Sequence, residues 1–349
     1  MNYFSTILIV KNRALGDSVM GLASVSYLRA LYPKANIIYA VPQWVAPLYE
    51  NVKTDANSIY PINLKTAKDM LKTLKDLRKM KIDYIHELHQ TGRGNKFFSL
   101  TAFFMGAVYS GHNHHYKSGT KILDQGVIKP LIQRDLDGVY SCFGDPDKKS
   151  IPKFLDFKPQ MRLEKLKSFP RIILGVVATR KTKMWPLSNY VVLANLIEKN
   201  FPEFEIVIPL SNSLEDKRIE ETLKTLNLSS KVKIERLSLS ELPRFFAESI
   251  FYFGNDTGLK HIAVATNLKS YTLFGPEPAQ EWHPYETLNH QYFYEENLDC
   301  RTRTHHYCGL SLCDLDETKK MQCLKKMSPE RAFEIVKFTC TDFHLTHDQ

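Results

Sequence analysis

Short runs of consecutive apolar residues, each followed by a helical pattern, constrain the fold of this chain most strongly. Ile7–Val10 shows no polar alternation, which is typical of a strand buried on both faces of a parallel sheet. A polar loop follows, and then an apolar pattern with helical spacing runs from Val19 to Leu31 and ends before Pro33. Asn36–Val41 is the next expected strand. This order of strand, helix and strand predicts an α/β fold.

The same alternation continues along the chain and is interrupted once. Leu64–Lys81 is expected to form an amphipathic helix and Tyr84–Leu88 a strand. Between Cys142 and Pro170, four prolines punctuate a charged segment, which predicts a domain junction. A second series follows, with expected strands at Ile172–Val177, Glu205–Ile208, Val232–Glu235, Ile250–Phe253 and Ser270–Phe274 and helices around 188–199, 214–225, 239–248 and 258–266.

This organisation predicts two parallel α/β domains, residues 1–165 and 166–327, followed by a last segment, 328–349. Ser328-Pro329-Glu330 is expected to begin a helix there, with proline at its favoured first position. In such folds, ligands bind at the carboxyl ends of the strands, so we expect the active site in a cleft between the domains.

Basic charge is concentrated in the first domain. The 349 residues carry 47 Lys and Arg against 38 Asp and Glu, a formal charge of +9. Residues 1–165 hold 24 basic and 14 acidic side chains, or +10, and the remainder is close to neutral. A uniformly basic coat for nucleic acid is therefore disfavoured, and no nucleic-acid motif is recognisable. One domain is expected to face an anionic partner.

The N-terminus and the cysteines bear on the compartment. Met1–Val10 lacks the basic region, the long apolar core and the cleavage site of a signal peptide. No run approaches the roughly 18–20 apolar residues of a membrane span. Reduced thiols are the default for six cysteines in such a chain. We expect a cytoplasmic protein that meets a membrane only at its surface.

The loop after the first expected strand ends in Leu15-Gly16-Asp17. Gly16 permits a tight turn into the following helix. Asp17 then falls at the helix N-terminus, where Asp often serves as the N-cap residue. Alternatively, Asp17 is a general base, kept ionised by the helix dipole. The two interpretations conflict, because a carboxylate committed to capping is a weaker base.

Two further motifs follow expected strands of the second domain. Thr179–Pro186 holds three cations beside two hydroxyl groups, which suits a pyrophosphate, although a solvated basic loop fits equally. Gly254–His261 follows a strand and opens a helix whose free amides favour phosphate oxygens. The alternative is an ordinary turn capped by Asp256 or Thr257. Phe274–Pro278 is a glycine-proline loop after the next strand.

Taken in order, these motifs resemble glycosyltransferase family 9, the ADP-heptose:lipopolysaccharide heptosyltransferases. The matching elements are Ile7–Val10 with Leu15-Gly16-Asp17, Lys183-x-Trp185-Pro186, Gly254-Asn255-Asp256-Thr257-Gly258-x-x-His261 and Phe274-Gly275-Pro276. The resemblance implies a GT-B fold, in which the first of two Rossmann-like domains binds the acceptor and the second binds the nucleotide-sugar donor. It also implies an inverting transfer that needs neither metal nor cofactor, and a last helix that packs back on the first domain.

The resemblance assigns roles residue by residue. Asp17 matches the catalytic base, which favours the base over the cap, and Lys183 matches the lysine that contacts the donor diphosphate. The other positions that match donor-contacting residues are Thr179, Glu215, Asp256, Thr257, Gly258 and His261. Ala178 departs from the pattern, because some relatives have a second hydroxyl residue there. One hydrogen bond to the donor is therefore absent or replaced.

The acceptor candidates come from the residues themselves. Arg93 and Lys96 lie in an expected loop after a strand, where they would face an anionic acceptor; a plain surface loop is the alternative.

Several possible metal ligands carry less weight. Cys300, Cys308, Cys313 and Cys323 lack a Cys-x-x-Cys pair, so reduced thiols are favoured over zinc. His112–His115 is interpreted as a surface loop, and Asp145-Pro-Asp147 as turns in the junction. We therefore predict no metal site.

The function expected from these observations is transfer of heptose from ADP-heptose to the inner core of lipopolysaccharide, at the cytoplasmic face of the inner membrane. Positive charge on the first domain would suit a phosphorylated glycolipid acceptor. Two alternatives remain open at this point. One is a GT-B transferase or epimerase that uses another nucleotide sugar, such as a uridine-linked one, and the other is a non-enzymatic basic module that binds membranes or nucleic acid.

Overall fold

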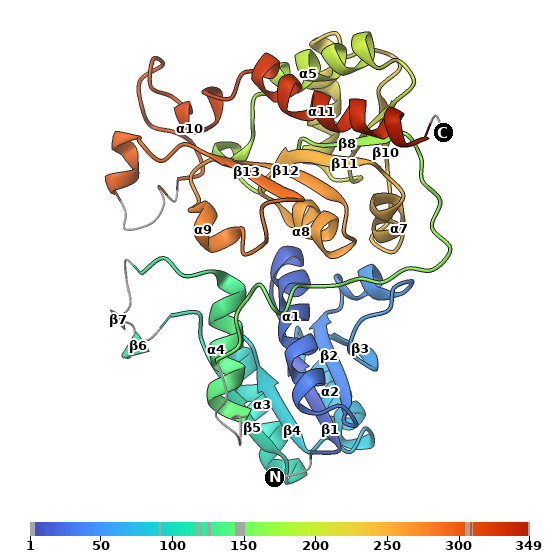
Figure 1. Ribbon diagram of the computed structural model, residues 1–349. Helices are drawn as coiled ribbons and strands as arrows, with labels where there is room; N and C mark the ends of the chain where they lie inside the picture. Colours follow the sequence, from blue (N-terminus) through green and yellow to red (C-terminus); the bar gives the residue numbers. More distant parts are fainter. Residues whose placement is uncertain are drawn as a thin grey trace. The chain divides into compact units, whose positions relative to one another are not determined.

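The computed structural model consists of two compact units, each described here by itself (Figure 1). One unit comprises Met1–Leu163 with Gln280–Tyr285, and the other comprises Glu164–Ala279 with Glu286–Gln349. The structure describes residues 4–90, 92–115, 117–118, 121–123, 127–143, 151–303, 308 and 310–347. Asp145, Asp147, His305 and His306 lie outside the described residues.

The first unit is built on a five-stranded parallel sheet in the order β3-β2-β1-β4-β5. Its strands are β1 (Thr6–Val10), β2 (Asn36–Pro42), β3 (Ser58–Ile62), β4 (Tyr84–Glu87) and β5 (Val108–Gly111). β1 lies at the centre and is buried throughout, which explains its uninterrupted apolar sequence.

Helices cover both faces of this sheet. Leu8 and Val10 of β1 join one core cluster with Leu77 of α2 (Ala67–Lys79) and Phe98 of α3 (Gly92–Met105). The intervening Ile7 and Ile9 are equally buried on the opposite face. There α1 (Leu15–Leu31) packs against α4 (Leu131–Phe143).

The second unit is built on a six-stranded parallel sheet in the order β10-β9-β8-β11-β12-β13. Its strands are β8 (Arg171–Gly175), β9 (Glu205–Pro209), β10 (Lys233–Glu235), β11 (Phe251–Asn255), β12 (Lys269–Phe274) and β13 (His290–Tyr294), and its main connecting helices are α5 (Leu187–Asn200), α6 (Leu214–Thr225), α7 (Leu242–Ala247) and α8 (Gly258–Ala265). Both sheets follow the order of doubly wound folds, and the predicted α/β class is confirmed.

The shorter elements are a two-stranded antiparallel ladder, β6 (Lys117–Ser118) with β7 (Lys121–Ile122), the short helices α9 (Ala279–Trp282) and α10 (Gln322–Lys325), and the 3-10 turns Ala46–Tyr49, Lys181–Lys183 and Asp299–Arg303. None of the helices among the described residues is long and apolar enough to cross a membrane.

The last helix, α11 (Pro329–His347), packs with the second unit. It lies beside α5 (Figure 1), and its buried residues Phe333, Val336 and Cys340 belong to the core of that unit. Tyr271 of β12 also lies 2.6 Å from Thr339, between their hydroxyl oxygens. The buried face of this helix therefore belongs to the second unit, and the expectation that residues 328–349 also pack back on the first domain stays a prediction.

Candidate active site

Asp17 lies in the first turn of α1, just beyond the carboxyl end of β1. The N-cap residue of this helix is Ala14, and no side chain caps the helix there. Asp17 is only 8% exposed, and its Oδ1 atom has no hydrogen-bond partner among the described residues. The N-cap interpretation is therefore wrong. A buried polar atom without a partner is uncommon in proteins and often marks a functional position.

The start of α1 is held in place by two tyrosines of the first unit. The Tyr39 hydroxyl donates to the Ser18 carbonyl oxygen at 2.6 Å, and the Ser18 and Tyr49 hydroxyl oxygens lie 2.7 Å apart. Gly21 makes this approach possible, because a Cβ atom there would lie 2.3 Å from the Tyr39 hydroxyl oxygen. The position of the Asp17 backbone is thus set by the buried hydrogen bonds of its neighbour Ser18 and by the close packing at Gly21, one turn further along the helix.

A buried network of ionisable side chains lies close to Asp17. Lys11 Nζ donates to Asp135 Oδ2 at 2.6 Å and lies 3.1 Å from His114 Nε2. The other oxygen of Asp135 lies 3.0 Å from His114 Nε2 and 3.3 Å from His112 Nε2. His112 Nδ1 is in turn 3.2 Å from His86 Nε2. The interpretation of His112–His115 as a surface loop is wrong for His112 and His114, which face this buried carboxylate.

Charge and burial fix the protonation states in this network. Burial alone would raise the pKa of Asp135, but Lys11 and His114 outweigh burial and hold that pKa well below its usual range. Burial, aided by Lys11, lowers the pKa of His114 to about 4, whereas Asp17 acts in the opposite direction. Burial and His114 lower the pKa of His89 to about 2. Lys11 and Asp135 are therefore a compensated ion pair beside the neutral imidazoles of His114 and His89.

Arg93 and Lys96, the acceptor candidates, are both exposed. They do not lie in a loop, as the sequence suggested, but in the first turns of α3. Neither forms an ion pair with any residue that the structure describes, so both cations remain available to an anionic partner.

In the second unit, one carboxylate joins two lysines at the carboxyl ends of β8 and β11. Asp256 Oδ2 lies 2.7 Å from Lys183 Nζ, and Asp256 Oδ1 accepts from Lys260 Nζ at 2.5 Å. Lys260 is fully buried, with its ammonium 4.7 Å from the centre of the Phe274 ring. Two lysines thus share the carboxylate of Asp256 at this edge. Doubly wound sheets bind ligands at this place, where the connections on either side run in opposite directions.

The pKa values follow the same balance. Burial alone would raise the pKa of Asp256, but Lys183 and Lys260 lower it far below its usual range. Burial lowers the pKa of Lys260 to about 8 despite the nearby carboxylate. Burial also raises the pKa of Glu277, which pairs with Arg180 beside this cluster.

Asn255 ties the loops of the second unit together. Its side-chain oxygen accepts from the Trp185 backbone amide at 2.9 Å, and its side-chain nitrogen donates to the Val176 carbonyl oxygen at 2.9 Å. The buried Trp185 ring donates through Nε1 to the Met327 carbonyl oxygen at 3.0 Å. The loop that carries Lys183 is thereby fixed against the loop that carries Asp256.

Gly275 allows the backbone of this region to pack closely. A Cβ atom at Gly275 would lie 2.6 Å from the Thr182 carbonyl oxygen, so the Phe274–Pro278 loop lies directly against the lysine loop. Gly258 begins α8, and Thr257 is its N-cap residue without a side-chain capping bond. Thr257 therefore holds the N-cap position, but its side chain does not cap the helix.

The remaining donor candidates are more scattered. His261 is buried in the first turns of α8, close enough for its charge to act on Asp256. Thr179 and Glu215 are exposed, in the loop after β8 and the first turn of α6. Within the described part of the chain, neither forms a hydrogen bond or ion pair with Lys183, Asp256 or Lys260.

The profile of glycosyltransferase family 9 (heptosyltransferase) matches residues 109–310, which is more than half of the chain. The chain belongs to glycosyltransferase family 9. It is therefore a glycosyltransferase, and the resemblance drawn from its motifs is confirmed.

Known members of family 9 agree with this assignment. The chain is 24% identical over 292 residues to lipopolysaccharide heptosyltransferase 1 of Campylobacter coli, which covers 78% of this chain and 84% of that protein. The structure of E. coli ADP-heptose LPS heptosyltransferase II matches with a TM-score of 0.72 at 18% identity, over 97% of this chain and 99% of that one. E. coli heptosyltransferase WaaC with ADP matches with a TM-score of 0.68 at 15% identity, over 96% and 99%. These likenesses confirm the GT-B fold.

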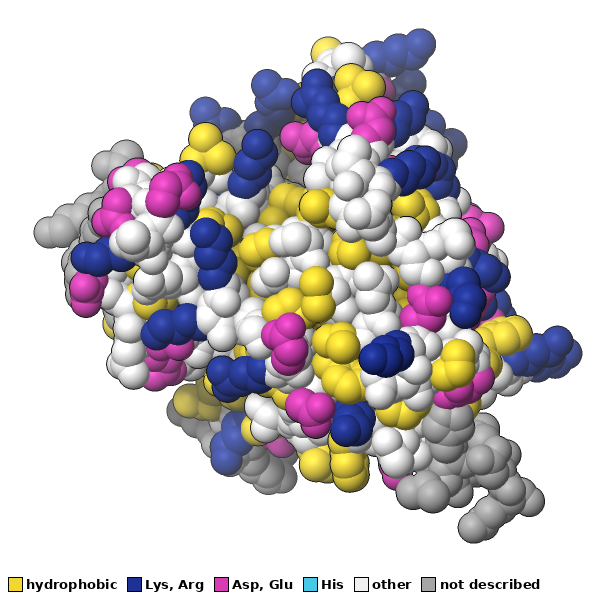
Figure 2. Space-filling model, turned by 90° about the horizontal axis from the view of Figure 1, so that it is seen from above, with side chains coloured by type: hydrophobic (Ala, Val, Ile, Leu, Met, Phe, Trp, Pro, Cys, Tyr) yellow, Lys and Arg dark blue, Asp and Glu magenta, His cyan; other side chains and the backbone are white. Residues whose placement is uncertain are grey.

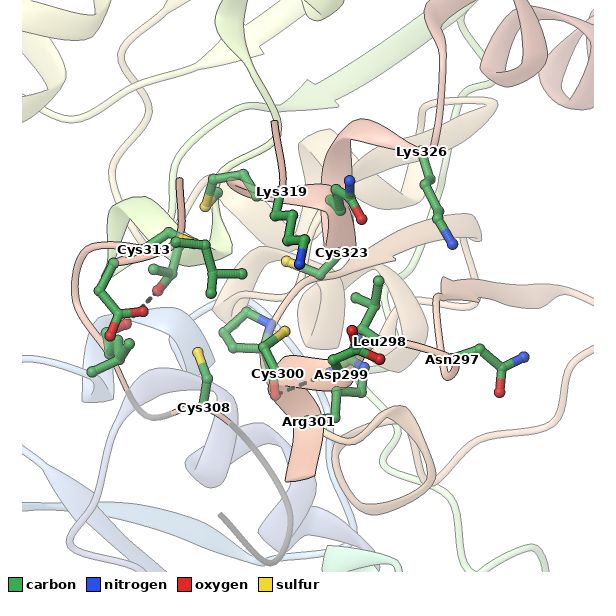
Figure 3. Close-up of a pocket in the computed structure, with 17 residues that line it drawn as sticks. Asn297, Leu298, Asp299, Cys300, Arg301, Cys308, Cys313, Lys319, Cys323 and Lys326 are labelled. Carbon is green, nitrogen blue, oxygen red and sulfur yellow. Dashed lines mark hydrogen bonds between the residues drawn. The ribbon is translucent and has the colours of Figure 1, made fainter. Parts of the chain in front are cut away.

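Cys300, Cys308, Cys313 and Cys323 of this family 9 chain lie around one cavity of about 380 Å³ in the second unit (Figure 3). Burial raises the pKa of the Cys323 thiol to about 11, and Cys300, Cys308 and Cys313 add to the effect. Cys323 is therefore a neutral thiol at neutral pH. No three His, Cys, Asp or Glu side chains among the described residues are grouped so as to hold a metal ion.

Sequence reasoning missed several residues of this family 9 site. Lys260 could have been found, because it lies four residues after Asp256 in the sequence, at a spacing at which ion pairs are common. Lys11 follows directly on an apolar strand, but nothing in the sequence indicates its burial. Asp135 and His114 are distant from Lys11 along the chain, and only the fold brings them together.

Proposed function

We propose that this chain transfers heptose from ADP-heptose to the inner core of lipopolysaccharide, with inversion at the anomeric carbon. Residues 1–165 would bind the acceptor and residues 166–327 the donor. The observation that carries the proposal is the buried carboxylate of Asp17, whose Oδ1 atom has no partner at the carboxyl end of β1. Family 9 membership and the curated and solved heptosyltransferases support the choice of substrates.

In the proposed reaction, Asp17 accepts the proton of an acceptor hydroxyl while that oxygen attacks the anomeric carbon of the donor. The bond between this carbon and the diphosphate oxygen breaks, and ADP leaves with the electron pair from the opposite face. Asp17 lies in the first turn of α1, just beyond the carboxyl end of β1. Its partnerless oxygen is free to receive the proton.

Charge that develops on the departing ADP is stabilised by the second unit. Lys183 is the more exposed of the two lysines on Asp256, so its ammonium is the one placed to contact a diphosphate. The first amides of α8, at Thr257 and Gly258, add hydrogen-bond donors at a helix start. Fixed cations and amides of this kind supply electrostatic stabilisation without a metal ion. Thr179, Glu215 and His261 complete the proposed donor site.

The acceptor is proposed to bind through Arg93 and Lys96 of α3, which are exposed cations. The inner core carries phosphates and Kdo carboxylates, which such cations attract. We place the enzyme in the cytoplasm, associated peripherally with the inner membrane, and expect no nucleic-acid partner.

The test incubates the purified protein with ADP-heptose and a panel of truncated lipopolysaccharide cores and measures product mass. A product heavier by one heptose is expected for one core and not for the others. Thermal stabilisation by ADP but not by UDP is expected in parallel; the reverse would favour a uridine-linked donor and refute the proposed one.

The base is tested separately with Asp17→Asn. This variant should lose transfer while it keeps its affinity for ADP, because the donor site lies in the other unit. Asp156→Asn is the matched control, since Asp156 is an exposed aspartate of the first unit. Near-normal turnover by Asp17→Asn would overturn the role of Asp17 as base.

A further inference from the structure

The outward surface of α2 and α3 in the first unit combines basic and apolar side chains. Four lysines, Lys68, Lys72, Lys75 and Lys79, are exposed along α2 at helical spacing. Leu71, on the same helix, is 58% exposed. None of these lysines forms an ion pair with a residue that the structure describes. Their ammonium groups are therefore available to an anionic partner.

The exposed residues in the last turns of α3 are apolar and large. Leu100, Phe103 and Phe104 are 56%, 78% and 63% exposed, and the two phenylalanine rings are 5.7 Å apart between centroids. Gly106, with φ of +67°, ends the helix directly after them. Two adjacent phenylalanines at the end of a helix project apolar area into solvent, which a soluble surface rarely tolerates without a partner.

The two helices present these residues side by side. Leu77 of α2 and Phe98 of α3 are buried in the same core cluster, so the opposite sides of both helices face solvent together. A hollow of about 360 Å³ at this end of the unit is lined by Arg78, Lys81 and Phe104, which places cations directly beside an exposed ring. We call the exposed residues Lys68, Leu71, Lys72, Lys75, Lys79 of α2 and Leu100, Phe103, Phe104 of α3 the α2–α3 face.

Acidic side chains offset only part of this charge, because α2 carries four lysines and Arg78 against two aspartates. Asp69 is bound by its own helix cap at Thr66, Asp76 accepts from the Tyr60 hydroxyl at 3.3 Å, and Asp83 accepts from two backbone amides at 2.8 Å each. The side of the molecule that carries α5 and α11 differs, since Lys and Arg there are interspersed with Asp and Glu (Figure 2).

We propose that the α2–α3 face docks this protein on an anionic lipid bilayer, with Phe103 and Phe104 inserted among the lipid head groups and the lysines against the lipid phosphates. Charge complementarity selects this occupant, because a basic field around exposed aromatic rings matches an anionic interface that is apolar a few ångströms below its surface. This docking surface gives a structural basis for the peripheral membrane association in the proposed function. It rests on the proposed function only for which membrane is bound.

The experiment measures binding of the full chain to vesicles of phosphatidylethanolamine, with and without phosphatidylglycerol, by sedimentation. The wild-type chain is expected to bind the anionic vesicles and to be released by salt. Phe103→Ser/Phe104→Ser should lower the partition coefficient about tenfold, from the loss of buried apolar area. Lys72→Glu/Lys75→Glu/Lys79→Glu should lower it by roughly a hundredfold, since each cation contributes near an anionic surface.

Matched controls lie in the second unit. Phe338→Ser changes an equally exposed phenylalanine, and Lys167→Glu/Lys199→Glu/Lys217→Glu makes the same charge change at exposed lysines. Both controls should bind as the wild-type chain does. Phe104→Trp provides a second measurement, because its fluorescence should shift to the blue when anionic vesicles are added.

Transfer to a water-soluble, delipidated core acceptor separates this proposal from the proposed function. The α2–α3 variants should keep this activity. If the protein binds vesicles through the α2–α3 face but transfers no heptose, the docking surface is supported and the proposed function is refuted. The docking surface would be refuted if the protein did not bind vesicles, or if the control variants lost binding to the same extent. It would also be refuted if the same lysines bound duplex DNA and the protein did not bind vesicles.

Discussion

Replacing Asp135 with Asn tests whether the buried charge of Lys11 depends on a single carboxylate. Lys11 and Asp135 are 0% and 1% exposed and lie 2.6 Å apart. Asn keeps the shape of the side chain but leaves the Lys11 ammonium without a counter-charge in the core. Removing one partner of a buried ion pair costs about 3–5 kcal/mol. For a unit of this size each kcal/mol lowers Tm by about 2–4 °C, so we expect Tm to fall by roughly 6–20 °C.

Calorimetry of the full chain measures this change, with amide hydrogen exchange assigning the transition to the first unit. Asp137→Asn is the matched control on the same helix, since Asp137 pairs with Lys129 at the partly exposed surface. Its expected cost is about 0–1 kcal/mol. Lys11→Met/Asp135→Leu, which removes both charges, should recover most of the lost stability. Equal shifts for Asp135→Asn and Asp137→Asn would refute the reasoning.

Three further predictions follow from the same contacts. The pKa of His114 is lowered to about 4 in the folded chain, so between about pH 6.5 and pH 4 the unfolded chain binds a proton at His114 that the folded chain does not. The Tm of the first unit should therefore fall as the pH is lowered through this range, and it should fall more steeply than in His114→Gln. Equal slopes for the two proteins would contradict this. Lys183→Met should raise the Kd for ADP about tenfold by calorimetric titration, while Lys181→Met, an exposed neighbour in the same turn, should leave it unchanged. Gly275→Ala would place Cβ 2.6 Å from the Thr182 carbonyl oxygen and should destabilise the second unit by about 1–3 kcal/mol in thermal melting, and an unchanged Tm would count against the packing described.

The central strands could be predicted from sequence because a strand that is buried on both faces has a continuous run of apolar residues. β1, β8, β11 and β12 all fall within a residue or two of the expected positions. The edge strand β5 was not predicted, since its residues are only partly buried and need no continuous apolar run. α3 was missed for a related reason, because its outward side carries phenylalanines that blur the helical pattern.

The donor candidates were readable because they are close together in sequence. Asp256, Thr257, Gly258 and His261 occupy one strand-to-helix turn, so the chain itself brings them together. Lys183 lies on another loop, but it also follows a buried strand, and the carboxyl ends of parallel strands share one edge of the sheet.

The sequence by itself determined that the chain would form two doubly wound sheets and that Asp17 would stand at the start of a helix. Only the tertiary structure decided that this carboxylate is buried and does not cap, because that depends on how Tyr39 and Tyr49 pack against α1. The partners of Lys11 and the unit that α11 joins were likewise decided in three dimensions. The periodicity of apolar residues predicts that one face of an element is buried. It does not predict which residues cover that face, because these are distant in the chain.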